Sequence, residues 1–204
     1  AQAKYDLAGC LRLSGRKREA KTLYLELLRA LPFHRMVMEA LTQVNRELLP
    51  ELEKRSADCP QDAENLAELA WCYHQLHEEE AADAAVACLP AEAVGTADYE
   101  NLAAKVKLAL GDWSSALTHL RAWETALRGQ DPVDPIRLPE SMRLQACALF
   151  SLGEKEQALD LLEQVGAQWP EDDESWKLRA QFLLSQNRLD EALSSAARYR
   201  ELAA

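Results

Sequence analysis

Cys72, His74 and His77 bring the usual ligands of zinc together within six residues, and three glutamates, 78–80, follow at once. A zinc site needs donors that converge on one point. With about 100° between successive helical residues, His74 and His77 share a face, whereas Cys72 lies about 140° from His77. We therefore expect no metal here. The histidines suit the C-terminal end of one helix and the glutamates suit the start of the next.

Motifs that support catalysis or cofactor binding are absent from the sequence. It contains no Gly-x-Ser-x-Gly nucleophile elbow and neither of the glycine-rich phosphate loops. The densest run of carboxylates, residues 171–174, precedes Trp176 and is typical of helix capping, because negative charge is favourable at a helix N-terminus. We expect no enzyme activity, no catalytic residues, no metal and no cofactor.

The charge of the chain argues against binding to nucleic acids or anionic membranes. The formal net charge is −11, and both of those partners attract cations. Residues 1–35 nevertheless carry eight basic and three acidic side chains, a net of +5, which leaves −16 on the remainder. The run Arg16-Lys17-Arg18 favours a solvated helix start over a dock for an acidic segment or a contact with a neighbouring domain.

Apolar runs and cysteines bear on location. No apolar run approaches the roughly 18 residues that span a bilayer, so we expect no membrane insertion. The five cysteines show no Cys-x-x-Cys pair and no regular spacing. This pattern indicates small buried apolar side chains in a reducing compartment, and it favours the cytoplasm.

A turn residue followed five positions later by alanine recurs along the chain. The pairs are Gly15 and Ala20, Gly111 and Ala116, Gly153 and Ala158, Asn187 and Ala192, and, more weakly, His77 and Ala82. Ala158 and Ala192 are 34 residues apart, as are Ala82 and Ala116. Between these landmarks, apolar residues follow helical spacing, as in Met142, Ala146 and Leu149. A period of this size predicts stacked helix pairs.

These landmarks resemble the tetratricopeptide repeat family over about four fifths of the chain. The copies are Leu7, Ala8, Leu11, Gly15, Ala20, Tyr24 and Pro32; Leu66, Leu69, Ala70, Tyr73 and Ala82; Ala104, Gly111, Ala116 and Leu120; Met142, Ala146, Leu149, Gly153, Ala158, Leu162 and Pro170; and Trp176, Ala180, Leu183, Asn187, Ala192 and Tyr199. The resemblance implies an all-α, right-handed α-solenoid of antiparallel helix pairs, a superhelix whose first helices line a concave groove.

We expect residues 1–204 to form a single solenoid. Its repeats are 1–34, an irregular 35–62, 63–96, 97–130 with an insert at 131–138, 139–172 and 173–204. In the irregular repeat we expect a helix over 33–45, and then a second segment, 51–57, that Pro50 starts or kinks. The proline-rich stretch from Gly129 to Pro139 predicts an extended linker. A tolerated surface insertion is the favoured interpretation, ahead of a bend or a contact edge.

Residues beside the packing stripe of each first helix are candidates to line the groove. The candidate partner-binding residues are Trp71, His74, Asn101, Lys105, Arg143, Lys177 and Gln181; Tyr5, Gly9, Arg12, Gln75 and Cys147 occupy further groove positions. The basic members could hold a peptide carboxylate or acidic side chains, and Trp71 could anchor a partner. The alternative is that they are solvated helix residues with local ion pairs.

The sequence therefore predicts a non-catalytic scaffold or adaptor that binds a peptide or partner protein in the groove, with acidic partners among those that the basic residues suit. Tyr5 and Gly9 do not match the residues with which chaperone-tail receptors of this family bind, so that class is not favoured. Two alternatives remain open. One is a regulatory or targeting module of a larger multidomain enzyme. The other is self-association through the solenoid ends, since the final helix carries apolar Leu189 and Leu193 with no polar capping helix after it.

Overall fold

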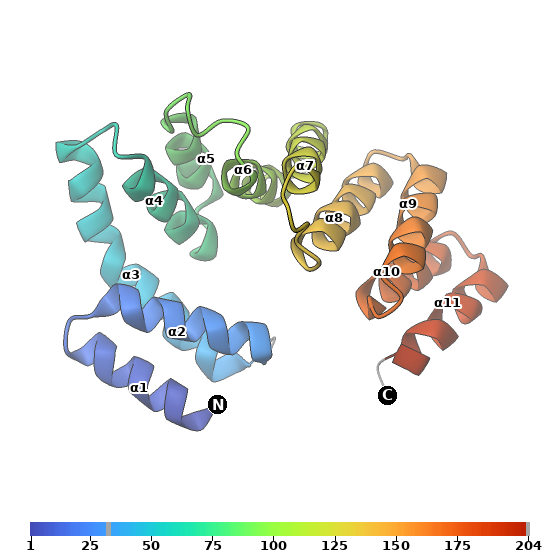
Figure 1. Cartoon of the computed structure of the whole chain (residues 1–204), viewed down its shortest axis with the longest axis horizontal. Helices are drawn as coiled ribbons and strands as arrows, with labels where there is room; N and C mark the ends of the chain where they lie inside the picture. Colours follow the sequence, from blue (N-terminus) through green and yellow to red (C-terminus); the bar gives the residue numbers. More distant parts are fainter. Residues whose placement is uncertain (32–33, 203–204) are drawn as a thin grey trace. The chain divides into compact units, whose positions relative to one another are not determined.

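The computed structural model describes residues 1–31 and 34–202, and in these residues the backbone forms α-helices and no β-strand (Figure 1). The helices are α1 (Gln2–Leu13), α2 (Lys17–Ala30), α3 (Arg35–Asp58), α4 (Ala63–Gln75), α5 (Glu79–Ala87), α6 (Ala97–Ala109), α7 (Trp113–Arg128), α8 (Arg137–Ser151), α9 (Lys155–Gln168), α10 (Asp173–Ser185) and α11 (Leu189–Leu202). The predicted all-α fold is confirmed.

The helices group into two compact units, residues 1–93 and residues 94–204. In the first unit each helix from α1 to α5 packs on the next, and in the second unit each helix from α6 to α11 does the same. Packing between sequence neighbours is how a solenoid of helix pairs is built, so the predicted architecture is confirmed. That residues 1–204 act as one continuous solenoid stays a prediction.

The turn inside each helix pair passes through one residue in the left-handed conformation. Gly153 has a φ of 91°, and the N–H of Glu154 donates to the carbonyl oxygen of Leu149 at 2.9 Å, which closes the end of α8. The same arrangement recurs in the other pairs, at Gly15, His77, Gly111 and Asn187. These are the five turn residues of the sequence pattern, and the left-handed conformation explains why glycine and asparagine are favoured there.

The alanines that recur in the sequence pattern are buried between the helices. The alanines of the packing stripes, none of them more than 6% exposed, are Ala8, Ala20, Ala70, Ala82, Ala104, Ala116, Ala146, Ala158, Ala180 and Ala192. Larger apolar side chains fill the space around them. Val44, Leu48 and Leu52 do so in the first unit, and Trp123 and Leu162 do so in the second.

The predicted gap between residues 45 and 51 is wrong, because α3 is one helix from Arg35 to Asp58 with Pro50 inside it. The helix changes direction along its length, in agreement with the predicted kink (Figure 1). Proline removes one helical hydrogen bond, at a typical cost of about 3 kcal/mol. Here Leu48 and Leu52 are both buried on one face of α3, and Pro50 is exposed on another. The continuous apolar stripe offsets the lost bond. Phe33, the expected first residue of this helix, lies outside the described residues.

The linker after α7 is shorter than predicted. Helix α8 begins at Arg137, so Pro139 lies in its first turn and is buried. Proline fits there because the first N–H groups of a helix have no intrahelical acceptor. Asp134 accepts hydrogen bonds from the N–H groups of Arg137 and Ile136, both at 2.9 Å, and these bonds hold the pKa of the Asp134 carboxyl below its usual range.

The cysteines differ from the prediction of buried side chains. All five are free thiols, but Cys10, Cys59 and Cys88 are exposed and Cys147 is half-buried. Only Cys72 is fully buried. The prediction was wrong for the exposed three because Cys59 lies in the cap after α3, Cys88 lies in the cap after α5, and Cys10 lies on an outer face of α1.

Gly166 on α9 is expected to tolerate no side chain. A Cβ atom there would lie 2.6 to 2.9 Å from ring atoms of Trp176 on α10. Gly166→Ala should therefore lower the free energy of unfolding by about 1–3 kcal/mol, measured by chemical denaturation. Gly9→Ala is the matched control, since Gly9 is also inside a helix but a Cβ would meet only the Tyr24 hydroxyl, at 3.9 Å. Equal stability of the two variants would contradict the steric argument.

Candidate partner-binding face

Five predicted groove residues lie on α6, α8 and α10, the first helices of the three pairs in the second unit. We call them the candidate face: Asn101, Lys105, Arg143, Lys177 and Gln181. Asn101 and Lys105 are one turn apart on α6, and Lys177 and Gln181 are one turn apart on α10. Gln181 is exposed and the other four are half-buried.

Lys105 connects α6 to α8 electrostatically. Its Nζ atom lies 2.9 Å from Oε1 of Glu140 and 5.9 Å from the centre of the Trp123 ring. The guanidinium of Arg137 lies 5.8 Å from the same ring, and Arg137 pairs with Asp98 on α6 at 2.6 Å. A cation at this distance from an indole gains about 0.5–1 kcal/mol at an exposed site. Two cations and a fully buried tryptophan thus tie α6, α7 and α8 together.

Arg143 connects α8 to the start of α10. It pairs with Asp172, the N-cap residue of α10. The same carboxylate accepts hydrogen bonds from the Ser175 hydroxyl and from the Ser175 N–H, the latter at 3.2 Å. The predicted capping role of the 171–174 run is confirmed for Asp172. Both side chains of the ion pair are less than one fifth exposed, so Arg143 is part of the packing between repeats.

Lys177 and Gln181 are the more accessible members of the candidate face. Lys177 pairs with Glu174 one turn earlier, at 3.0 Å, and this carboxylate raises the pKa of the lysine. The pair is solvated, so it contributes little to stability. Within the described residues, the Gln181 side chain makes no hydrogen bond. Asn101 differs, because its Oδ1 atom is buried and has no donor in the described part of the chain.

Trp71 and His74 lie on α4, in the first unit. Their rings meet edge to face with centroids 5.8 Å apart, and Nδ1 of His74 lies 2.9 Å from the Glu79 carboxylate. Tyr73 between them donates its hydroxyl to Glu53 at 2.7 Å, and burial together with that carboxylate raises its pKa to about 12. The structure therefore places these two candidates together in the first unit, and the other five in the second.

Lys21 and Cys72 form a buried polar contact that the sequence did not indicate. Nζ of Lys21 donates to Sγ of Cys72 at 3.2 Å, and Cys72 faces Oδ1 of Asn45 at 3.5 Å. Asn45 in turn donates to Gln75 at 2.6 Å. Burial raises the pKa of the Cys72 thiol. The cluster joins α2, α3 and α4 inside the first unit.

The basic run near the N-terminus is matched by carboxylates and carbonyls of the same unit. Arg18 pairs with Glu68 at 2.9 Å and lies 3.6 Å from Glu51. Lys17 donates to the backbone oxygen of Glu47 at 2.9 Å. Much of the positive charge that the sequence concentrates here is therefore offset within the first unit.

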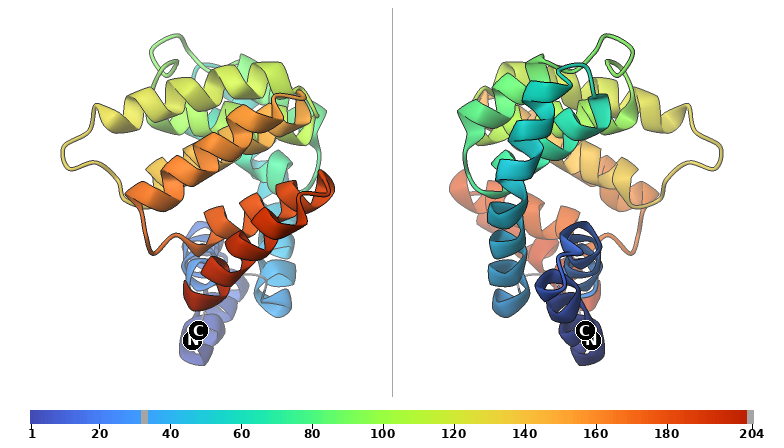
Figure 2. Two further views of the ribbon diagram at one scale, coloured as in Figure 1. Left: turned by 90° about the vertical axis from the view of Figure 1, so that its right-hand side faces the viewer. Right: turned by 90° about the vertical axis from the view of Figure 1, so that its left-hand side faces the viewer.

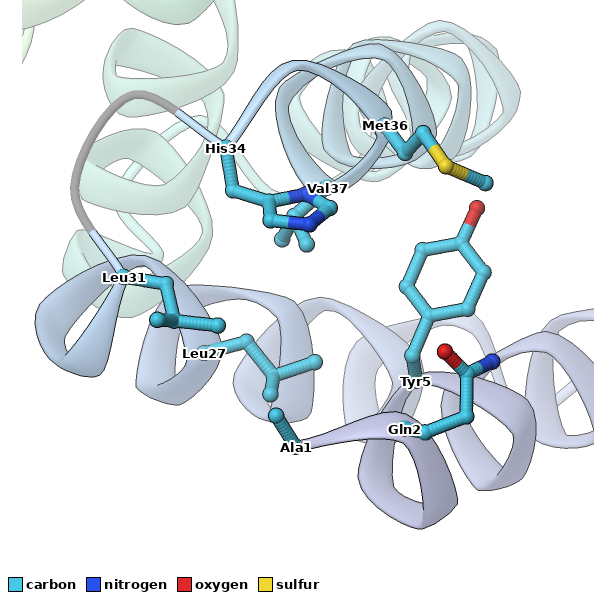
Figure 3. A pocket seen from close by; sticks show the side chains of 8 residues that line it. All are labelled: Ala1, Gln2, Tyr5, Leu27, Leu31, His34, Met36 and Val37. Atoms are coloured by element: carbon cyan, nitrogen blue, oxygen red, sulfur yellow. The ribbon is translucent and has the colours of Figure 1, made fainter.

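A small cavity opens between α1, α2 and the start of α3 (Figure 3). Its lining residues are Ala1, Gln2, Tyr5, Leu27, Leu31, His34, Met36 and Val37. Its volume is about 50 Å³, whereas sites for small organic ligands usually enclose about 300–1,000 Å³. The cavity has room for a few atoms, not for a cofactor.

Metal sites and membrane spans are both absent from the described ranges, 1–31 and 34–202. No group of three or more His, Cys, Asp or Glu side chains in them is arranged to hold a metal ion. Nor does any described helix combine the length and the apolar character needed to cross a bilayer.

The comparisons with known proteins agree with the fold. Residues 140–172 match the family model described as tetratricopeptide repeat. No curated protein sequence matches the chain. Among solved structures, MamA is 13% identical, with a TM-score of 0.61 over 96% of this chain and 94% of that one. Putative kinesin light chain repeats from Podosopora anserina are 16% identical, with a TM-score of 0.61 over 98% and 93%.

YrrB is described as a TPR protein with an unusual peptide-binding site, and it is 20% identical, with a TM-score of 0.55 over 74% of each chain. Identities this low show a shared fold. The chain is thus an α-solenoid of the helix-pair class. One repeat, residues 140–172, matches the tetratricopeptide repeat model, and the chain as a whole shares its fold with the solved structures named above.

The sequence reasoning missed the acidic partners of the candidate face. Glu140, Asp172 and Glu174 all lie in the cap or first turn of α8 or α10, where acidic residues are common for local reasons. Their second role is pairing with cations of the candidate face. Glu140 and Asp172 pair with cations on another helix, so their pairing depends on how the helices pack, whereas Glu174 pairs with Lys177 one turn along the same helix. A signal does exist, since Glu140 and Glu174 are 34 residues apart and occupy equivalent positions in successive repeats.

Asp172 is expected to stabilise the second unit through both of its contacts. Asp172→Ala removes the cap of α10 and leaves Arg143 without its carboxylate, so the free energy of unfolding should fall by about 2 kcal/mol or more. Asp172→Asn keeps a capping oxygen and should cost clearly less. Asp112→Ala, which removes the N-cap of α7 alone, is the control. Chemical denaturation that ranks Asp112→Ala as the most damaging would contradict the double role.

Proposed function

We propose that this chain is a non-catalytic scaffold that binds an acidic segment of a partner protein on the candidate face of the second unit. The observation that carries the proposal is the row of cations on successive first helices. Lys105 lies on α6, Arg143 on α8 and Lys177 on α10, and the first helices are the elements that line the groove in solenoids of this kind. YrrB, with the same fold, is described as having a peptide-binding site.

The ion pairs suggest how a partner would be bound. Arg143 is fixed by a carboxylate that also caps a helix, so its role is to hold α8 and α10 in place. Lys177 has a solvated partner one turn away, and an incoming carboxylate can replace that partner at little cost. Lys105 is more enclosed. We therefore assign direct contact with the partner to Lys177 first, then to Lys105, with Gln181 donating to peptide backbone.

A non-catalytic role in the cytoplasm is part of the same proposal. In support of it, three of the five free thiols are exposed, and exposed thiols persist as thiols in a reducing compartment. The close contacts of the candidate face are ion pairs between carboxylates and basic side chains.

Phage-displayed peptides selected on the purified chain test this proposal. We expect the selected peptides to be rich in Asp and Glu. In fluorescence anisotropy, Lys105→Gln/Lys177→Gln should weaken their binding at least about tenfold, equivalent to about 1.4 kcal/mol. Binding should also weaken as salt is raised, because exposed charge pairs are screened.

The matched control is Lys54→Gln/Arg121→Gln, which removes the same charge from exposed positions on α3 and α7. It should leave the affinity unchanged. Equal binding to both double variants would contradict binding at the candidate face. Selected peptides that carry no acidic residues would contradict it too.

A further inference from the structure

Within residues 34–202, nothing packs on one apolar face of α11, the last described helix of the second unit. It packs on α10 through buried Ala192 and Ser195. On the other side, Leu189 and Leu193 are 54% and 69% exposed, and Ala197, one turn further on, is exposed too. These residues follow i, i+4, i+8 spacing and so form one stripe. Figure 2 (left) shows α11 in front of α10, at the edge of the unit.

Opposite charges stand at the two ends of this stripe. Asp190 lies in the first turn of α11 and Arg200 lies in its last turn. Each is exposed, and within the described residues neither side chain forms an ion pair. The ten-residue step from Asp190 to Arg200 spans about 15 Å along the helix, at 1.5 Å per residue. Most other charged side chains of α10 and α11 do pair, for example Arg188 with Glu191 and Arg198 with Glu201.

We propose that the α11 stripe binds the same stripe of a second copy of this chain, with the two helices antiparallel. A two-fold axis that crosses the exposed face of α11 at the level of residue 195 places Asp190 of each copy opposite Arg200 of the other, so that two ion pairs form at once. The same axis places Leu193 opposite Ala197 of the second copy, a large side chain against a small one. Charge is therefore complementary at Asp190 and Arg200, and side-chain size is complementary at Leu193 and Ala197, as a two-fold interface requires.

The charge pattern favours a second copy of this chain as the partner of the stripe, and it favours the antiparallel orientation of the two helices. A parallel pair would bring Asp190 against Asp190 and Arg200 against Arg200, which is repulsive. Two short helices bury less than the roughly 1,200 Å² of a standard stable interface. The dimer should accordingly be reversible, with dissociation in the micromolar range or weaker.

Sedimentation equilibrium of the whole 204-residue chain tests the proposal with a charge-swap set. Wild type should show a reversible monomer–dimer equilibrium. Asp190→Lys alone and Arg200→Asp alone should each shift the dissociation constant at least about tenfold towards monomer. An equimolar mixture of these two variants should dimerise again, because each lysine and arginine then meets an aspartate. The double variant Asp190→Lys/Arg200→Asp should dimerise like wild type.

Asp160→Lys, an exposed change of the same charge on α9, should leave the equilibrium unchanged, and circular dichroism checks that every variant folds. A wild type that stays monomeric at the highest soluble concentration overturns the proposal and leaves the stripe to a different protein. A mixture that associates while the double variant does not would overturn the antiparallel orientation. Association that none of the charge changes affects would place the contact elsewhere on the chain.

Discussion

The close approach of neighbouring helices at alanine is the constraint on which the rest of this structure depends. Ala146 on α8 and Ala158 on α9 are both fully buried, and a methyl group at such positions lets two backbones come together without a gap. The larger side chains then interlock around the contact, as Trp123 and Leu120 do. Because cores are close-packed, the spacing set at the alanines fixes the position of each first helix.

That spacing decides which charged groups can meet. With α6, α8 and α10 held in place, Lys105 reaches Glu140 and Arg143 reaches Asp172. In both ion pairs, the carboxylate lies at the start of the next repeat's first helix. Glu140 lies in the first turn of α8, and Asp172 is the cap of α10. The basic row of the second unit is therefore largely neutralised inside the chain. A partner must either exchange with the solvated carboxylate of Glu174 or bind beside the pairs.

Local features were predictable from the sequence, and features that depend on distance were not. The five turn residues and the packing alanines are fixed by backbone conformation and by close contact, so residue type reveals them directly. Helix α3 was misjudged because a local rule about Pro50 was outweighed by Leu48 and Leu52, which bury one stripe on both sides of it. The Lys21–Cys72 contact joins residues 51 positions apart. Composition and periodicity contain no trace of such a pairing.

The segment between α7 and α8 shows where this architecture accepts change. Inside a pair, the left-handed turn fixes the length of the connection, and one added residue would rotate the second helix out of register. Residues 129–133 are exposed and come before Asp134, the residue that begins α8 by accepting its first N–H groups. An epitope or a fluorescent label inserted there would leave both flanking helices intact, giving a reporter that moves with the second unit.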